Sequence, residues 1–184
     1  MGDAPDRNRE AHYTAPMNLD ADIVPGRSIG GIVLGQQALE LIERLQQHAQ
    51  VVVRPALNLD YTCYDIDEAM TIVVGNRDFL VVNLVARSGY RGCLFGYIHA
   101  GMRVHELIAG ASSALLQAIH LHNEFVYLDR AQSVGFLLPP QYDDVADRIE
   151  HLPADLVLDT LYVMPPAMWQ VPGRDGKLVW RPVD

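Results

Sequence analysis

The stretch Gly30-Gly31-Ile32-Val33-Leu34-Gly35-Gln36-Gln37-Ala38-Leu39-Glu40-Leu41-Ile42 decides the fold of this chain. A related stretch follows as Gly96-Tyr97-Ile98-His99-Ala100-Gly101-Met102-Arg103-Val104-His105-Glu106-Leu107-Ile108. One constant offset aligns Gly30 with Gly96 and Gly35 with Gly101, and it also carries Tyr61 onto Tyr127. We interpret the two stretches as the starts of two copies of one supersecondary unit.

Composition is that of a globular protein with a full core. The chain has 184 residues, of which 49% are hydrophobic and 20% charged. This length allows one large domain or two small ones. No run is long and apolar enough to cross a membrane, and residues 1–7 lack the basic and apolar segments of a secretory signal. We therefore expect a cytoplasmic protein that does not enter membranes.

Charge and cysteine content restrict the classes of partner. The formal net charge of −9 argues against nucleic acid, whose phosphates would be repelled, and it favours a basic protein partner. Cys63 and Cys93 occupy non-equivalent places in the two copies. Two cysteines do not form a disulfide framework, so reduced thiols are expected, with a single bridge as the alternative.

The pattern predicts an α+β fold of two tandem units, each a helix followed by an antiparallel β-meander. The units would form a continuous or paired sheet and be followed by a C-terminal β-hairpin. The expected boundaries are a disordered leader at 1–22, a first unit at 23–92, a second unit at 93–164 and the hairpin at 165–184.

The first unit has a helical period over residues 36–48, where Leu39, Ile42 and Leu45 share one face. Glycine at position 35 suits the close turn from extended chain into this helix. Short β-rich runs follow, separated by turn-like segments that include 65–68, and the expected strands are 51–53, 59–64, 69–74 and 79–85.

The second unit repeats this order. An extended segment at 93–98 precedes a helical pattern over 104–121. An insertion with one helical turn is expected near residues 142–147. The expected strands are 124–128, 133–138 and 156–163.

Beyond Pro165-Pro166, an Asp175-Gly176 turn signals the C-terminal hairpin, which holds both tryptophans, Trp169 and Trp180. We expect the hairpin to pack on a sheet edge, because large aromatic side chains usually bury. The alternatives are a patch that binds a partner and a homodimer contact.

His120-Leu121-His122 with Glu124 is the best metal candidate in the chain. On an extended strand both imidazoles and the carboxylate would project to one face. On a helix the two rings would diverge. The alternative function is therefore a small metal-dependent enzyme or ligand-binding domain that uses these residues. Our leading interpretation has no metal and no cofactor.

No nucleophile, base and orienting residue occur together in a recognisable motif, which favours a protein that is not an enzyme. Acidic and tyrosine side chains in the loops could instead contact a basic partner and raise the association rate. The expected partner-binding residues are Tyr61, Asp65, Asp67, Glu68, Asp143 and Asp144.

The duplicated order, with Ile32-Val33-Leu34-Gly35 opening a unit, resembles the tandem fold of the β-lactamase inhibitory protein and of small outer-membrane-assembly lipoproteins. The resemblance covers about residues 24–164. It implies a surface that binds another protein. The chain differs from those lipoproteins in lacking a signal and lipobox cysteine, and from the inhibitor in lacking paired cysteines in each unit. Its size, acidity and lack of a catalytic set are also similar to those of immunity proteins of bacterial toxin systems.

Overall fold

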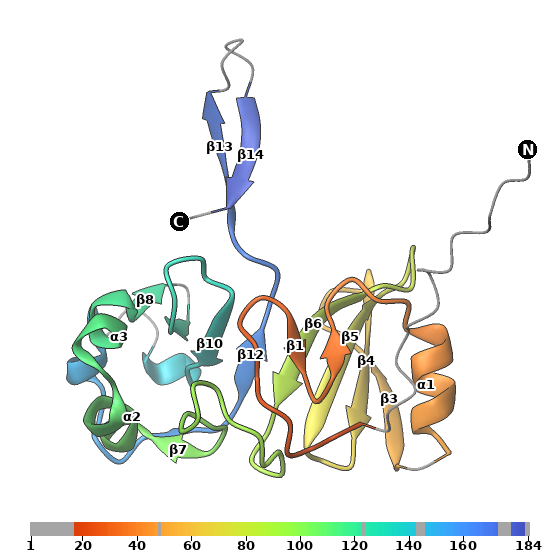
Figure 1. The fold of residues 1–184 in the computed structure, drawn as a ribbon, viewed down its shortest axis with the longest axis horizontal. Coiled ribbons are helices and arrows are strands. Elements are labelled where there is room, and N and C mark those ends of the chain that lie inside the picture. Colours follow the sequence, from red (N-terminus) through yellow and green to blue (C-terminus); the bar gives the residue numbers. More distant parts are fainter. Residues whose placement is uncertain (1–16, 48, 123, 143–145, 173–177, 183–184) are drawn as a thin grey trace, which may run out of the picture.

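A large antiparallel sheet dominates the computed structural model, which describes residues 17–47, 49–122, 124–142, 146–172 and 178–182. The fold is α+β, with few helices (Figure 1). In spatial order the eight strands are β3 (Val51–Pro55), β4 (Tyr61–Ile66), β5 (Met70–Gly75), β6 (Val81–Ala86), β12 (Leu161–Val163), β10 (Val134–Leu137), β9 (Phe125–Tyr127) and β8 (His120–His122).

The sheet joins two sets of strands at its centre, where β6 pairs with β12 and Val85 lies opposite Tyr162. Strands β3 to β6 follow one another in sequence on one side of this junction, and β8, β9, β10 and β12 on the other. Smaller ribbons pair β1 (Ser28–Ile29) with β2 (Ile32–Val33), β7 (Met102–Arg103) with β11 (Val157–Leu158), and β13 (Met168–Pro172) with β14 (Leu178–Pro182).

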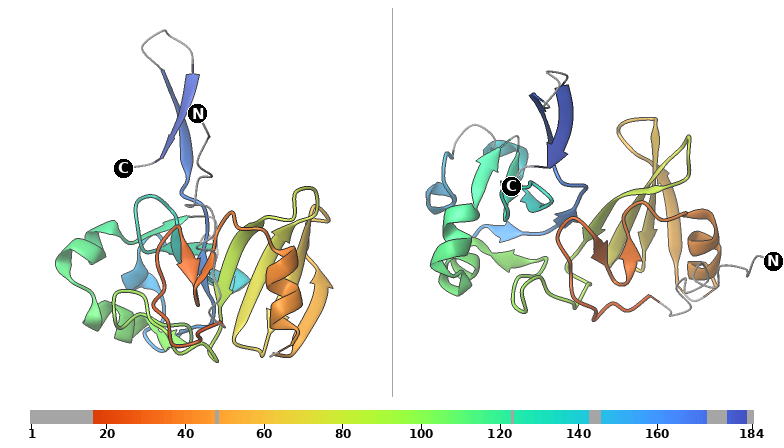
Figure 2. Two further views of the ribbon diagram at one scale, coloured as in Figure 1. Left: turned by 45° about the vertical axis from the view of Figure 1, so that its right-hand side comes forward. Right: turned by 45° about the horizontal axis from the view of Figure 1, so that its top comes forward.

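The helices contribute to the core at opposite ends of the sheet, with α1 (Leu39–Leu45) near β3 and β4, and α2 (Val104–Gly110) and α3 (Ser113–Ala118) toward β8 (Figures 1 and 2). Two 3-10 turns, η1 (Pro140–Tyr142) and η2 (Ile149–His151), lie between β10 and β11.

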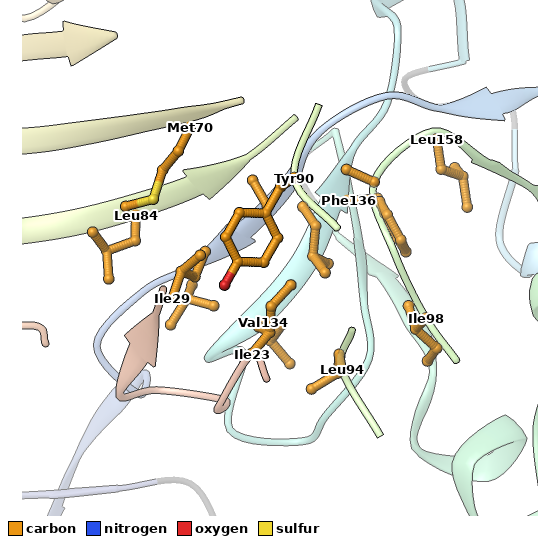
Figure 3. Close-up of a cluster of buried hydrophobic side chains, with 14 of the residues drawn as sticks. Ile23, Ile29, Met70, Leu84, Tyr90, Leu94, Ile98, Val134, Phe136 and Leu158 are labelled. Atoms are coloured by element: carbon orange, nitrogen blue, oxygen red, sulfur yellow. The ribbon is translucent and has the colours of Figure 1, made fainter. Parts of the chain in front are cut away.

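A single hydrophobic cluster joins the large sheet, the helices and the β1–β2 and β7–β11 ribbons. Ile29 of β1, Leu94, Ile98 and Phe136 of β10 are each completely buried in it (Figure 3). Burial of side chains this large supplies the main driving force for folding. The core therefore fixes one face of the sheet against the helices and the β1–β2 and β7–β11 ribbons.

The four strands expected between residues 51 and 85 are confirmed with shifted bounds. The segment 65–68, expected to be a turn, is only partly one. Asp65 and Ile66 belong to β4, because Ile66 is completely buried against the core. The turn lies at Asp67-Glu68, where both residues have positive φ (46° and 58°) and Ala69 N donates to Ile66 O (2.9 Å) across them.

The first helix is shorter than its sequence pattern. Residues preceding Leu39 pair with the chain leading into β6, since Ala38 N donates to Phe79 O (2.8 Å) and Val81 N donates to Gln36 O (3.0 Å). These tertiary hydrogen bonds delay the start of α1, while Gly35 has the expected turn conformation (φ 79°). His48, the expected end, lies outside the described residues.

The prediction of a continuous helix over residues 104–121 is wrong. Ser112 adopts an extended conformation (ψ 159°), and its hydroxyl accepts a hydrogen bond from Leu115 N (3.2 Å). This N-cap ends one helix and starts the next, because serine satisfies an amide that would otherwise lack a partner. The chain leaves the helix before His120, where β8 begins.

One segment expected to be extended and one expected strand are also interrupted. Residues 93–98 form a tight turn, in which Leu94 and Ile98 make the only bridge within the segment and Phe95 and Gly96 have positive φ. The segment 156–163 divides at Asp159-Thr160 into β11 and β12, which pair with different strands. In both segments the chain changes direction to bring apolar residues to the core.

The described part of the expected leader packs on the fold. Leu19 O accepts hydrogen bonds from the amides of Arg91 (3.0 Å) and Gly92 (2.9 Å), and the Asp20 carboxylate pairs with Arg91 at 2.6 Å. Residues 17–22 are therefore held by the chain around Arg91, whereas residues 1–16 lie outside the described part.

Asp175-Gly176 and the side chains of Trp169 and Trp180 lie outside the described residues, so the expected turn and the packing of the tryptophans stay predictions. Among the residues that the structure describes, no helix has the length and apolarity needed to cross a membrane.

Candidate functional site

One face of the eight-stranded sheet does not take part in the hydrophobic core. Along β4, Tyr64 and Ile66 pack with the core cluster, whereas Cys63 and Asp65 point to the opposite side because successive residues of a strand alternate. We call this side the open face. Its residues are Val52, Arg54, Tyr61, Cys63, Asp65, Thr71, Val73, Asn83, Val85, Arg87, His120, His122, Phe125, Tyr127, Gly135, Leu137, Thr160 and Tyr162.

One row of this face crosses the whole sheet, since directly opposed residues project to the same side. Strand register places these residues in the order Val52, Asp65, Thr71, Val85, Tyr162, Gly135, Tyr127 and His120. The first half of the row holds aliphatic, charged and hydroxyl side chains, and the second half is aromatic apart from Gly135. Residues far apart in sequence are thereby brought onto one surface.

The aromatic half is a continuous chain of rings. His120 stacks on Tyr127 at 5.3 Å between ring centroids, and Tyr127 stacks on Phe125 at 5.4 Å. Phe125 then meets Tyr162 edge to face at 5.3 Å. These separations are those of favourable aromatic pairs. The four rings therefore stabilise one another on the side of the sheet that faces away from the core.

Gly135 makes room for one of these rings. A Cβ at this position would lie 2.7 Å from Val126 O and 3.3 Å from a ring carbon of Tyr127. Glycine therefore lets Tyr127 lie close over the sheet surface, as aromatic residues do over strand glycines.

The charged half centres on Asp65. Its carboxylate accepts hydrogen bonds from Arg54 Nε (2.7 Å), an Arg87 terminal nitrogen (2.9 Å) and the Thr71 hydroxyl (2.6 Å). The Asp65 side chain is 17% exposed, while those of Arg54 and Arg87 are 46% and 35% exposed. The carboxylate is thus enclosed, and the two guanidinium groups remain accessible.

These contacts perturb the ionisation of the group. Burial acts to raise the pKa of Asp65, but hydrogen bonds from Arg54 and Thr71 and the charge of Arg87 outweigh it and lower the pKa. The hydrogen bond with Asp65 raises the pKa of Arg54. Burial raises the pKa of Tyr162. At neutral pH the cluster contains one carboxylate and two cations.

Of the residues expected to contact a partner, the structure places Tyr61 and Asp65 on the open face. Asp67 and Glu68 lie at the exposed turn that ends β4. Asp143 and Asp144 lie outside the described residues. Asp65 does not present an unpaired negative charge, because both of its oxygens accept hydrogen bonds from arginine.

The two histidines of the metal candidate do lie on one face of β8. His120 Nδ1 is 3.0 Å from Ala118 O, and its other ring nitrogen is 3.4 Å from Gln132 Nε2. Glu124 is exposed and has positive φ (62°). In the described part of the chain no three His, Cys, Asp or Glu side chains form a group that could hold a metal ion.

Sequence reasoning missed the most prominent residues of this face, namely Arg54, Arg87, Phe125, Tyr127 and Tyr162. A signal was present in Phe125-Val126-Tyr127-Leu128, where every residue is large and apolar or aromatic. A strand of this kind covers both of its faces with hydrophobic side chains. The arginines had no comparable local signal.

The two cysteines are not joined to each other. Both thiols are free, as expected, and the Cys63 thiol is buried between strands on the open face. A buried thiol in such surroundings behaves as a small hydrophobic side chain.

Comparisons with known proteins leave the site to be interpreted from its geometry, since no family model, curated protein or solved structure matches the chain.

Proposed function

We propose that the chain is a non-enzymatic inhibitor of another protein, of the type that confers immunity to a bacterial toxin, and that it acts in the cytoplasm. It would cover the active site of the toxin or enzyme with the open face of the sheet. The observation that carries this proposal is the row of aromatic and arginine side chains on a face that the core leaves uncovered.

The composition of the open face suits protein binding. Tyrosine and arginine are enriched among the residues that dominate the energy of protein interfaces. Tyr127, Tyr162, Arg54 and Arg87 are each held by neighbours in the free protein. Such pre-organisation reduces the entropy that is lost when a partner binds.

We further infer that the sheet consists of two copies of one helix-and-meander unit. The order of elements supports this, since helices precede β3 to β6 and also precede β8, β9, β10 and β12. Gly30 and Gly96 both have positive φ, as do Gly35 and Gly101. If the sheet is duplicated in this way, the chain would resemble the β-lactamase inhibitory protein in outline.

Charge would act at longer range than these contacts. The net charge of −9 would attract a basic partner and increase the rate of encounter. We propose Asp67 and Glu68, at the exposed turn that ends β4, as acidic contact residues at the rim. Asp143 and Asp144 lie outside the described residues and stay predicted contacts. The partner would therefore be basic overall.

Co-expression with the products of adjacent genes tests this proposal. The toxic product should stop growth of a bacterial host when expressed alone, and this chain should restore growth. Phe125→Ala and Tyr162→Ala should weaken binding to that product by about tenfold or more, as expected for central aromatic contacts. Glu43→Ala, an exposed change on α1, serves as the matched control. Equal growth with all variants would contradict the role of the open face.

A further inference from the structure

Among the described residues, the contacts of the two arginines beside Asp65 use only part of their hydrogen-bond donors. Arg87 donates to Asp65 from one terminal nitrogen, and Arg54 donates from Nε and one terminal nitrogen. A guanidinium group has five N–H donors. With 35% and 46% of their side chains exposed, both arginines can bind a further acceptor from outside.

Asp65 holds the two cations together but cannot itself receive a partner. Its Oδ1 accepts from Thr71 (2.6 Å), Arg87 (2.9 Å) and Arg54 (3.3 Å), and its Oδ2 accepts from Arg54 (2.7 Å). Because both arginines contact one carboxylate, their guanidinium groups lie within a few ångströms of each other. The shared carboxylate offsets the repulsion between the two cations.

The position of Arg54 and Arg87 on the open face favours binding of an anion. One carboxylate and two guanidinium groups leave a local charge of +1 on a chain whose net charge is −9. In the row across the sheet, Val85 lies between Thr71, which donates to Asp65, and Tyr162, so the pair lies beside the aromatic rings. A partner seated there would exclude water and strengthen the attraction of an anion.

We propose that Arg54 and Arg87 form a docking point for a carboxylate side chain of the protein partner. This inference rests on the proposed function and names the chemistry at the centre of the interface. A planar carboxylate matches the fork of N–H donors on arginine. A partner that is basic overall would be attracted by the net negative charge of this chain. A single acidic residue on that partner could then pair with the local positive charge of Arg54 and Arg87.

A first experiment needs no partner. Side-chain Nε–H signals of isotopically labelled protein are followed by NMR during addition of sodium acetate, with sodium chloride and acetamide as reference solutes. Acetate should produce saturable shifts at Arg54 and Arg87, and Arg87→Lys should weaken the response about tenfold because the fork is lost. Arg77→Lys, in the exposed Arg77–Asp60 pair (3.7 Å), is the matched control.

Each other outcome of the titration overturns the inference. These outcomes are shifts no larger with acetate than with chloride, an equal response to acetamide, and an equal loss of response in the Arg77→Lys control. Unfolding of Arg87→Lys would be seen in its backbone spectrum, and Arg54→Lys then serves as the second variant.

The growth assay separates this inference from the proposed function. If Tyr162→Ala abolishes neutralisation and Arg87→Lys weakens partner binding about tenfold, both stand. If Tyr162→Ala abolishes it and Arg87→Lys binds normally, the carboxylate docking point is wrong and the inhibitor function remains. If neither variant changes neutralisation, the open face is not the interface and both fail.

Discussion

Replacing Asp65 by asparagine should destabilise the protein by removing the negative charge that Arg54 and Arg87 share. The amide oxygen can still accept one or two hydrogen bonds, so the contact with Thr71 at 2.6 Å can survive. What disappears is the charge opposite two cations at 2.7 and 2.9 Å. The change therefore isolates electrostatics from packing.

The exposure of the three side chains sets the magnitude. Ion pairs at the surface contribute about 0–1 kcal/mol, whereas breaking a buried pair costs about 3–5 kcal/mol. Asp65 is 17% exposed and its partners are 46% and 35% exposed, which places the cluster between these limits. We expect Asp65→Asn to lower the free energy of unfolding by about 1–2 kcal/mol at pH 7.

The lowered pKa of Asp65 determines how its contribution to stability changes with pH. Because the pKa of Asp65 is lowered from its ordinary value of 3.8 in the folded protein, the stabilisation is present above that value. It is lost as the pH falls through the folded pKa. The difference between wild type and Asp65→Asn should therefore shrink below about pH 4.

Urea denaturation from pH 2 to pH 7 measures this difference. Asp60→Asn, in the pair with Arg77 (88% exposed), should change stability by less than about 0.5 kcal/mol. A change of under about 0.3 kcal/mol for Asp65→Asn at pH 7, or a difference that persists undiminished at pH 2, would refute the reasoning.

Three further predictions concern the core and the chain around Tyr90. Phe136→Ala should cost about 3–5 kcal/mol in urea denaturation, because the ring is completely buried; a loss below about 1 kcal/mol would contradict the packing. Gly92→Ala would place Cβ 1.9 Å from Ala21 O, so hydrogen exchange at Ile23, whose amide donates to Cys93 O, should accelerate; unchanged protection would count against this. Burial raises the pKa of Tyr90 to about 12, so its contribution to stability should be lost as the pH rises from 10 to 12. Tyr90→Phe should remove this alkaline loss of stability. Identical stability profiles for the wild type and Tyr90→Phe between pH 10 and 12 would contradict the prediction.

Local sequence predicted the elements where a single strand or turn decides them. Short β-rich runs between turn-like segments predicted strands between residues 51 and 85, and the glycines at 35 and 101 have the left-handed backbone that suits a close turn. The prediction failed over 104–121, where a helical period continues through Ser112 and His120. There the serine cap and the pairing of β8 with β9 outweigh periodicity.

Local sequence likewise predicted only part of the candidate functional surface. Tyr61 and Asp65 were predicted as contacts, but the arginines that enclose Asp65 were not, since Arg54 and Arg87 lie 11 and 22 residues from it in the chain. The Phe125–Tyr162 contact likewise joins strands that are separated by β10. Pairing register alone brings these side chains together.

From the sequence by itself, the α+β class, most of the strands and the tight glycine turns followed, because backbone conformation and alternation are set by near neighbours along the chain. Only the tertiary structure decided which side of the sheet is covered and what the other side presents. The reason is that the junction between β6 and β12 and the packing of the helices are long-range contacts, and no local pattern specifies which strands will become neighbours.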